Sequence, residues 1–294
     1  MSVLSFLMRT KFKKADAERN EGQTTPEDII RFDDIPYGKD PKWHILDVYR
    51  PKSAEGKKLP VIINVHGGGW VYGSKEGFQY YCMSLAQRGF AVVNYNYRLA
   101  PEHKYPDCFE DTNNAFKWVL SHGDEYGFDL DHIFAVGDSA GGHILGMYAN
   151  FCTNPEYAKK YSMKPPKGFA PTAIALNCGA YKFDEPGFEG NLMKILPILL
   201  PKKWKKEDID WITVPTYVTE KFPPTYIMTA TGDFLKEQAP LMVKKMEEYN
   251  IPYAYKIYGN KDKNLLHVFH CDLRLAEAKK CNDDECNFFK QFCD

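Results

Sequence analysis

The sequence predicts an α/β fold with a mainly parallel central sheet. Short, continuous apolar runs, such as residues 61–65 and 133–136, have the length and composition of strands buried inside a parallel sheet. Segments of helical periodicity lie between these runs, for instance residues 77–88 and 108–122. Because parallel strands need long crossover connections, this alternation indicates βαβ units with helices on both faces of the sheet.

The predicted elements follow one another from residue 29 to the C-terminus. Residues 29–35 and 43–49 are expected to form a hairpin around the turn residues 36–41. The later strands are expected at 61–65, 90–95, 133–136, 172–176, 225–230 and 253–258, and the helices at 77–88, 108–122, 142–150, 236–250 and up to about 292. No internal repeat or low-complexity linker interrupts the series, so a single domain over residues 1–294 is expected.

Two segments fall outside the βαβ pattern and are expected to supply a small cap. Residues 1–28 begin with an apolar stretch followed by basic residues, which we interpret as an amphipathic helix. Residues 184–218 combine the apolar run 192–200 with the charged run 202–208. We expect the two segments to pack together, and a plain surface excursion is the alternative for the second.

Composition excludes several kinds of partner. The 38 Lys and Arg residues nearly balance the 39 Asp and Glu residues, and no long run of like charge suggests a nucleic-acid or polybasic membrane surface. No apolar run is long enough to cross a bilayer, and residues 1–8 lack the leading charge of a secretory signal, so a cytoplasmic protein is expected. The eight cysteines form no C-x-x-C pair and match no common zinc module, so free thiols and no metal are expected.

The clearest functional motif lies at residues 137–141, Gly-Asp-Ser-Ala-Gly, between a predicted strand and a predicted helix. Glycines two positions before and after Ser139 permit a cramped turn that carries the hydroxyl to a helix N-terminus. A serine that merely caps the helix is the alternative, because G-x-S-x-G also occurs by chance.

Three further features come shortly after other predicted strands, namely the glycines 67–69, Asp233 and His267. In an open parallel sheet the working site lies beyond the carboxyl ends of the strands. We therefore expect these residues and Ser139 to meet at one edge of the sheet, in the chain order serine, aspartate, histidine.

These residue types suit nucleophilic acyl transfer. His267 would take the proton of the serine hydroxyl and return it to the leaving alcohol, and Asp233 would hold the imidazole in the required tautomer. The amides of Gly67, Gly68 and Ala140 would donate to the oxyanion of the tetrahedral intermediate. Singly, each residue could instead be an ordinary loop residue, but their joint placement favours catalysis.

Four motifs carry a family resemblance: His-Gly-Gly-Gly-Trp at 66–70, Tyr-Arg-Leu-Ala-Pro-Glu at 97–102 with Pro106, Gly-Asp-Ser-Ala-Gly-Gly at 137–142, and Phe-Pro-Pro-Thr-Tyr-Ile at 222–227 leading to Asp-Phe-Leu-Lys-Glu at 233–237. With these the chain, over about residues 40–290, resembles the hormone-sensitive-lipase-like branch of the α/β-hydrolase fold, which contains bacterial esterases and acetylesterases. The resemblance implies that fold with a cap, the triad Ser139, Asp233 and His267, the amides of Gly67, Gly68 and Ala140 as oxyanion hole, and no cofactor.

Two positions depart from the family pattern. Glu237 stands where the family usually has an aspartate, and His267-Val268-Phe269 replaces His-Gly-Phe. His270 is close enough in sequence to compete for the role of base, but the matching Phe269 favours His267.

The expected function is therefore a serine carboxylesterase that hydrolyses short acyl esters through an acyl-enzyme intermediate. The expected partner is a small-molecule ester, and the resemblance suggests an acetylated sugar. A homodimer is one expected assembly. An amide or peptide hydrolase is one alternative, because the same triad serves all acyl transfer. A non-catalytic binding homologue is another, since the family resembles plant hormone receptors, but those lack the histidine that is present here.

Overall fold

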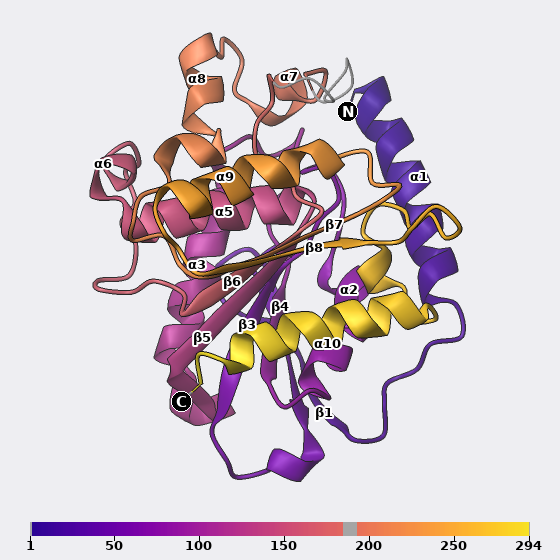
Figure 1. The fold of residues 1–294 in the computed structure, drawn as a ribbon. Coiled ribbons are helices and arrows are strands. Elements are labelled where there is room, and N and C mark those ends of the chain that lie inside the picture. Colours follow the sequence, from indigo (N-terminus) through magenta and orange to yellow (C-terminus); the bar gives the residue numbers. More distant parts are fainter. Residues whose placement is uncertain (1, 185–192, 294) are drawn as a thin grey trace.

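The computed structural model describes residues 2–184 and 193–293, which fold around one eight-stranded sheet (Figure 1). The strands are β1 (Ile29–Pro36), β2 (Ile45–Pro51), β3 (Leu59–Val65), β4 (Ala91–Tyr95), β5 (Phe128–Asp138), β6 (Ala173–Asn177), β7 (Thr225–Ala230) and β8 (Tyr253–Tyr258). Their order across the sheet is β1-β2-β4-β3-β5-β6-β7-β8. Strand β2 pairs antiparallel with β1 and β4, and all other neighbours are parallel, which confirms the predicted sheet.

Helices connect the strands and cover both faces of the sheet. The α-helices are α1 (Val3–Asn20), α2 (Lys75–Ala86), α3 (Asp107–Ser121), α4 (Gly123–Tyr126), α5 (Ala140–Thr153), α6 (Pro155–Ala158), α7 (Leu196–Leu199), α8 (Lys206–Trp211), α9 (Ala239–Glu248) and α10 (Ala276–Lys290). Short 3-10 helices lie at η1 (Lys52–Ala54), η2 (Val214–Tyr217), η3 (Lys236–Gln238) and η4 (Phe269–Cys271). In the part of the chain that the structure describes, no helix is both long and apolar enough to span a membrane.

The sheet separates two apolar cores because neighbouring side chains on a strand point to opposite faces. On β3, Val61, Ile63 and Val65 pack in the core that contains α3, α5 and α9. Ile62 packs in the core that contains α2 and α10, two helices that lie side by side in Figure 1. With both faces buried, the strand is a continuous apolar run rather than an alternating one, as the sequence indicated.

Strand β5 extends further than its apolar run. The sequence predicts a strand at residues 133–136, whereas β5 begins at Phe128. Its first half is polar and partly exposed, and it joins the sheet because Phe128 and Asp129 pair with Leu59 and Pro60 of β3. This extension depends on backbone pairing with a distant strand, so apolar periodicity does not reveal it.

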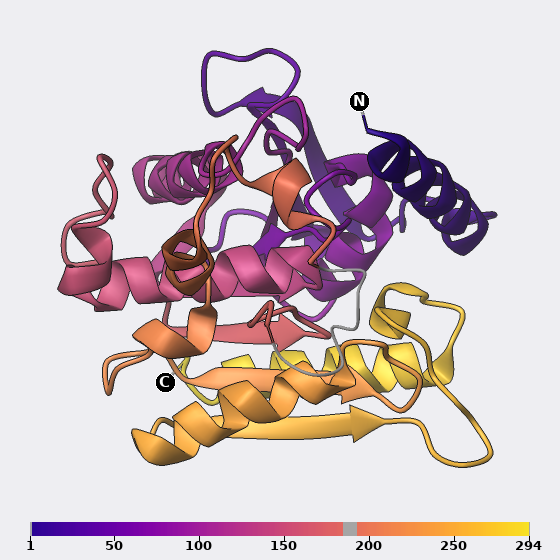
Figure 2. The same cartoon turned by 90° about the horizontal axis from the view of Figure 1, so that it is seen from above.

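Helix α1 packs beside α2 at the edge of the molecule, as Figures 1 and 2 both show. The Arg19 guanidinium donates to the carbonyl of Gly77 at 2.6 Å, and Arg9 Nε donates to the carbonyl of Val71 at 2.7 Å. The segment predicted as the second part of a cap is described only in part, since residues 185–192 lie outside the described residues. In its described part, the Leu199 carbonyl accepts from the Tyr105 amide at 2.9 Å.

Candidate active site

Ser139 lies in the turn between β5 and α5, with φ 52° and ψ −115°. Such a left-handed backbone is unfavourable for a residue with a side chain, and the surrounding packing holds it there. A Cβ atom on Gly141 would meet the carbonyl oxygen of Val65, and one on Gly137 would meet the Gly141 backbone at 2.6 Å. The glycines around Ser139 are therefore required by close backbone contacts, which hold the serine at the carboxyl end of the sheet.

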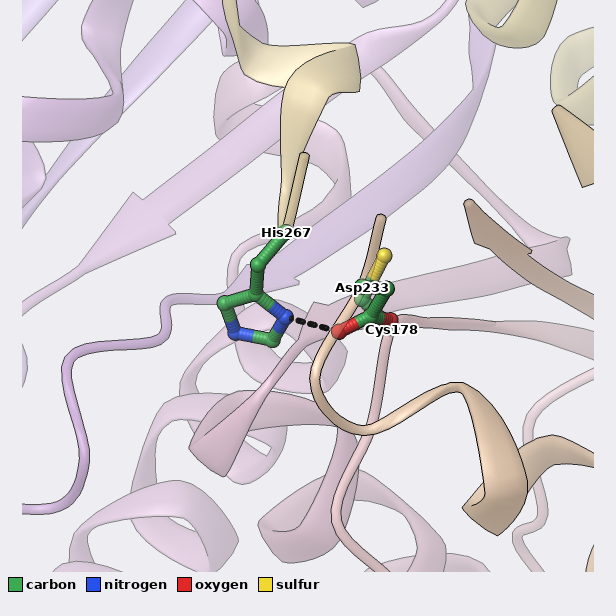
Figure 3. A group of neighbouring side chains, drawn as sticks. All are labelled: Cys178, Asp233 and His267. Carbon is green, nitrogen blue, oxygen red and sulfur yellow. Dashed lines mark hydrogen bonds and ion pairs between the residues drawn. The ribbon is translucent and has the colours of Figure 1, made fainter. Parts of the chain in front are cut away.

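The structure brings Ser139, His267 and Asp233 into one hydrogen-bonded chain. The Ser139 hydroxyl lies 2.9 Å from His267 Nε2, and His267 Nδ1 lies 2.6 Å from Asp233 Oδ1, as the dashed line in Figure 3 marks. A carboxylate can only accept, so Nδ1 carries a proton and Nε2 presents its lone pair to the serine. This is the arrangement that a general base for Ser139 needs.

Asp233 is buried but keeps its charge. Burial by itself raises the pKa of Asp233, but the hydrogen bond and charge of His267 and the bonds from the Leu235 amide and Thr229 hydroxyl hold it below the usual value. The Leu235 N–H donates to Oδ1 at 2.9 Å, and Thr229 Oγ1 donates to Oδ2 at 2.8 Å. An ionised carboxylate thus faces the imidazole at neutral pH.

His270, the other histidine considered as a base, points into the core. It is fully buried, and its ring meets Tyr81 edge-on at 5.1 Å. Burial lowers the pKa of His270 to about 3, so this ring stays neutral. In contrast, His267 is partly exposed and contacts the exposed ring of Phe234 at 4.3 Å between ring centroids.

In the glycine loop after β3, the amide of Gly67 does not point where the sequence led us to expect. The Gly67 N–H donates to Asp138 Oδ1 at 2.9 Å and is therefore occupied, although Gly67 was expected to serve the oxyanion. Burial raises the pKa of Asp138 to about 7 against the opposing effects of His267, Arg19 and the Gly67 amide. The motif order alone could not reveal this bond, because it joins two loops that meet only in the fold.

The next amides in the loop have no such partner. Within the described part of the chain, no hydrogen bond engages the N–H of Gly68, Gly69 or Ala140. Gly68 and Gly69 have φ values of 118° and 61°, which side chains rarely adopt, and the Tyr72 amide donates to the Gly68 carbonyl at 3.0 Å. This turn leaves amides unpaired near Ser139 at the edge of the sheet where an oxyanion would form.

Neighbouring elements hold this loop in place. Helix α1 contributes Arg9, whose guanidinium binds the carbonyls of Val71 and Ala100 and pairs with Glu102 at 2.5 Å. His66 is buried, its ring stacks on Tyr97 at 4.2 Å between centroids, and its Nδ1 lies 2.8 Å from the Gly67 carbonyl. Burial lowers the pKa of His66 to about 4, so it is a neutral donor that shapes the loop.

Hydrogen bonds on the side of the sheet covered by α2 and α10 also hold the turn at Ser139. The Ser139 amide donates to the Asn177 carbonyl at 2.9 Å, and Asn177 Nδ2 donates to Glu285 Oε2 at 2.6 Å. Tyr81 donates its hydroxyl to the other carboxyl oxygen of Glu285 at 3.0 Å. This buried network ties α10 and α2 to the end of β6, and through it to the turn that carries Ser139.

Sequence reasoning missed four residues of this site: Asp138, Thr229, Phe234 and Cys178. Asp138 lies inside the serine motif and Phe234 directly follows Asp233, so their places in the sequence could have marked them as residues of the site. Thr229 and Cys178 belong to no motif, and only the folded sheet places them beside Asp233.

Comparisons with known proteins give consistent matches. A family model described as BD-FAE matches residues 46–245. Esterase LipC from Mycobacterium tuberculosis is 38% identical over 42% of this chain and 30% of its own length. Versiconal hemiacetal acetate esterase from Dothistroma septosporum is 28% identical over 72% of this chain and 67% of its own length. The chain thus spans less than a third of LipC and about two thirds of the second relative.

Among solved structures, an inhibited esterase B from Lactobacillus rhamnosis superposes with a TM-score of 0.88. The two sequences are 24% identical, and the match covers 98% of this chain and 95% of that chain. This likeness, together with the strand order, shows that the fold is the expected α/β-hydrolase fold.

Proposed function

Because this chain belongs to the BD-FAE family, we propose that it is a serine carboxylesterase that hydrolyses short acyl esters. The observation that carries the proposal is the hydrogen-bonded chain from Ser139 through His267 to Asp233, with distances of 2.9 and 2.6 Å. Relatives and structural neighbours named as esterases support ester hydrolysis as the reaction class. The acetate ester in the name of the Dothistroma relative supports a short acyl group.

In the proposed mechanism, Ser139 Oγ attacks the ester carbonyl as His267 Nε2 takes its proton. The C–O bond to the alcohol then breaks, the imidazolium gives the proton to the departing oxygen, and an acyl-Ser139 ester remains. A water molecule repeats the sequence with His267 as base and releases the acid. Asp233 stabilises the imidazolium in both steps without taking a proton itself.

We assign the oxyanion hole to the amides of Gly68, Gly69 and Ala140. The assignment differs from the sequence expectation by exchanging Gly67 for Gly69, because the Gly67 amide is engaged by Asp138. Asp138 then acts as a positioning residue that joins the glycine loop to the serine turn. Each such donor typically contributes about 3 kcal/mol to transition-state stabilisation.

Replacing Gly68 by alanine tests this assignment. A Cβ atom there would meet the Tyr72 carbonyl, and the φ of 118° would also be strained, so the loop must shift. We expect kcat for a short ester to fall by about 10²-fold, with a smaller change in KM, because the oxyanion forms only during reaction.

Gly56→Ala is the matched control, since Gly56 also has a positive φ (74°) but a Cβ atom added there would meet no atom of the described residues within 4 Å. It should retain wild-type kcat. Equal losses in both variants, or none in Gly68→Ala, would contradict the assignment.

We also propose that α1 and the described residues 193–218 act as the cap of a single domain. Arg9 of α1 reaches the loop after the glycines, and Lys104 Nζ donates to the Pro197 carbonyl of α7 at 2.8 Å. Helix α1 therefore contacts the loops that follow β3 and β4, and the second segment contacts the loop that follows β4. An acetylated sugar as substrate, a homodimer and a cytoplasmic location stay predictions from the sequence.

The function is tested by measuring hydrolysis of p-nitrophenyl esters from acetate to palmitate. We expect kcat/KM to be highest for acetate or butyrate and to fall with longer chains. A maximum at palmitate would refute the short-acyl proposal. If the folded protein turned over no ester but cleaved p-nitroacetanilide, the amide alternative would replace it.

A further inference from the structure

Cys178, Asp233 and His267 form a cluster of metal-ligand atoms at the carboxyl ends of β6, β7 and β8 (Figure 3). The thiol sulfur, a carboxylate oxygen and an imidazole nitrogen all lie within 4.8 Å of one another. Within residues 2–184 and 193–293, no other group of three such side chains comes this close. The proposed mechanism uses two of these residues and gives Cys178 no part.

The backbone directs Cys178 toward this cluster. It directly follows β6, has φ 48°, and its N–H donates to the Met228 carbonyl at 2.8 Å. The side chain is 1% exposed, and Sγ also lies 3.8 Å from Met228 Sδ. The sulfur is thus held beside the aspartate at a fixed position rather than free on the surface.

We propose that a thiophilic divalent cation, Zn²⁺ or Cd²⁺, binds between Cys178 Sγ, the Asp233 carboxylate and His267 Nδ1 and reversibly inhibits the enzyme. Thiolate, imidazole and carboxylate are the ligands that zinc takes in proteins, whereas Mg²⁺ and Ca²⁺ prefer oxygen alone. The inhibition half of the proposal rests on the proposed function, and the binding half does not.

The site needs only small movements to hold the ion. Zinc bonds of about 2.0–2.3 Å in a tetrahedral site set neighbouring donors roughly 3.3–3.7 Å apart. His267 Nδ1 and Asp233 Oδ1, now 2.6 Å apart, would separate by about 1 Å, and Cys178 would move inward by a similar amount. The His267 side chain is 17% exposed, so one of the three ligand residues is accessible from solvent.

Binding exchanges protons for the metal. Burial raises the pKa of the Cys178 thiol well above its usual value, so this group is protonated before the ion arrives. The cation forms bonds to Sγ and Nδ1, and the thiol proton and the Nδ1 proton leave their atoms. One of them moves to His267 Nε2 and the other is released to solvent.

This exchange explains why the ion would inhibit. With Nδ1 bound to metal, the neutral imidazole carries its proton on Nε2, the nitrogen that lies 2.9 Å from Ser139 Oγ. That nitrogen then donates to the serine and cannot remove its proton. Asp233 is also turned from the imidazole to the ion. We expect kcat to fall in proportion to the bound fraction, with little change in KM.

The experiment titrates the 294-residue protein with CdCl₂ in the absence of substrate and follows the ultraviolet cadmium–thiolate charge-transfer band. The same samples are then assayed with p-nitrophenyl acetate. Wild type should bind one equivalent of Cd²⁺, with band intensity and inhibition rising together, while millimolar Mg²⁺ has no effect. Cys178→Ser should lose the band and raise the inhibition constant at least about tenfold, each variant being compared with its own metal-free rate.

Cys152→Ser is the matched control, because Cys152 is more exposed than Cys178 but belongs to no ligand cluster among the described residues. It should retain both the band and the inhibition, and near-ultraviolet circular dichroism checks that both variants are folded. Absence of a stoichiometric band in wild type, or equal inhibition of wild type and Cys178→Ser, would overturn the proposal. A Cys178-dependent band in a protein without esterase activity would instead support the metal site and refute the proposed function.

Discussion

Replacing Ser139 by alanine is expected to lower kcat/KM for p-nitrophenyl acetate by about 10⁴-fold or more. The hydroxyl of Ser139 lies within hydrogen-bond distance of His267 Nε2, and without it no acyl-enzyme can form. The glycine-loop amides and the rest of the site would remain, so a small residual rate above water is expected. Steady-state hydrolysis, together with labelling by an active-site phosphonate, measures the effect.

The fold should tolerate this change. Alanine keeps the amide that donates to the Asn177 carbonyl, and it has no more difficulty than serine with φ 52°. Ser121→Ala on α3 is the control and should retain full activity and labelling. Among the described residues, that hydroxyl bonds only within its own helix and to the adjacent His122. Wild-type turnover by folded Ser139→Ala would refute Ser139 as nucleophile and with it the proposed mechanism.

Replacing Asp233 by asparagine is expected to lower kcat by up to about 10⁴-fold with little change in KM. The amide has the shape of the carboxylate but no charge, so it cannot stabilise the imidazolium that forms when Ser139 loses its proton. The Leu235 amide requires an acceptor at the Oδ1 position, and Thr229 can reverse its hydroxyl to accept from an amide nitrogen. The surroundings therefore favour an asparagine with its oxygen toward His267, which makes charge the main loss.

Asp131→Asn provides the comparison, since Asp131 is exposed near the start of β5, at the end of the strand away from Ser139. We expect wild-type kcat for that variant. Measurement of kcat and KM separately distinguishes lost catalysis from lost binding. If Asp233→Asn raised KM tenfold and left kcat unchanged, Asp233 would have a binding role and the proposed triad would be wrong.

Much of the fold followed from local patterns. Buried parallel strands show as continuous apolar runs, so residues 225–230 coincide with β7. Residues 253–258 coincide with β8 although this strand lies at the edge of the sheet and is largely exposed, because its tyrosines and isoleucine favour a strand. The polar start of β5 was missed because its pairing partner, the beginning of β3, is distant in sequence. Strands whose own side chains are apolar or favour β-structure were thus located well. The start of β5 was not, because it joins the sheet through backbone pairing with a strand distant in sequence.

The candidate site divides in the same way. The chain order of Ser139, Asp233 and His267, each following a strand, was sufficient to expect them at one sheet edge, and the structure places them within hydrogen-bond distance. The bond that engages the Gly67 N–H was not foreseen, because a motif specifies residue type but not the direction of an N–H. The bond to Asp138 depends on two loops meeting at 2.9 Å.

By itself, then, the sequence determined the α/β class, the elements that end at the active edge and the residue types available there. These depend on periodicity, on glycine backbone freedom and on the chemistry of single side chains. Only the tertiary structure decided which amides stay unpaired among the described residues, that Thr229 and Leu235 hold Asp233, and that Cys178 lies beside Asp233 and His267. Those facts depend on distances between strands such as β6 and β7, which are neighbours in the sheet but about 50 residues apart in the chain, and no local pattern records such distances.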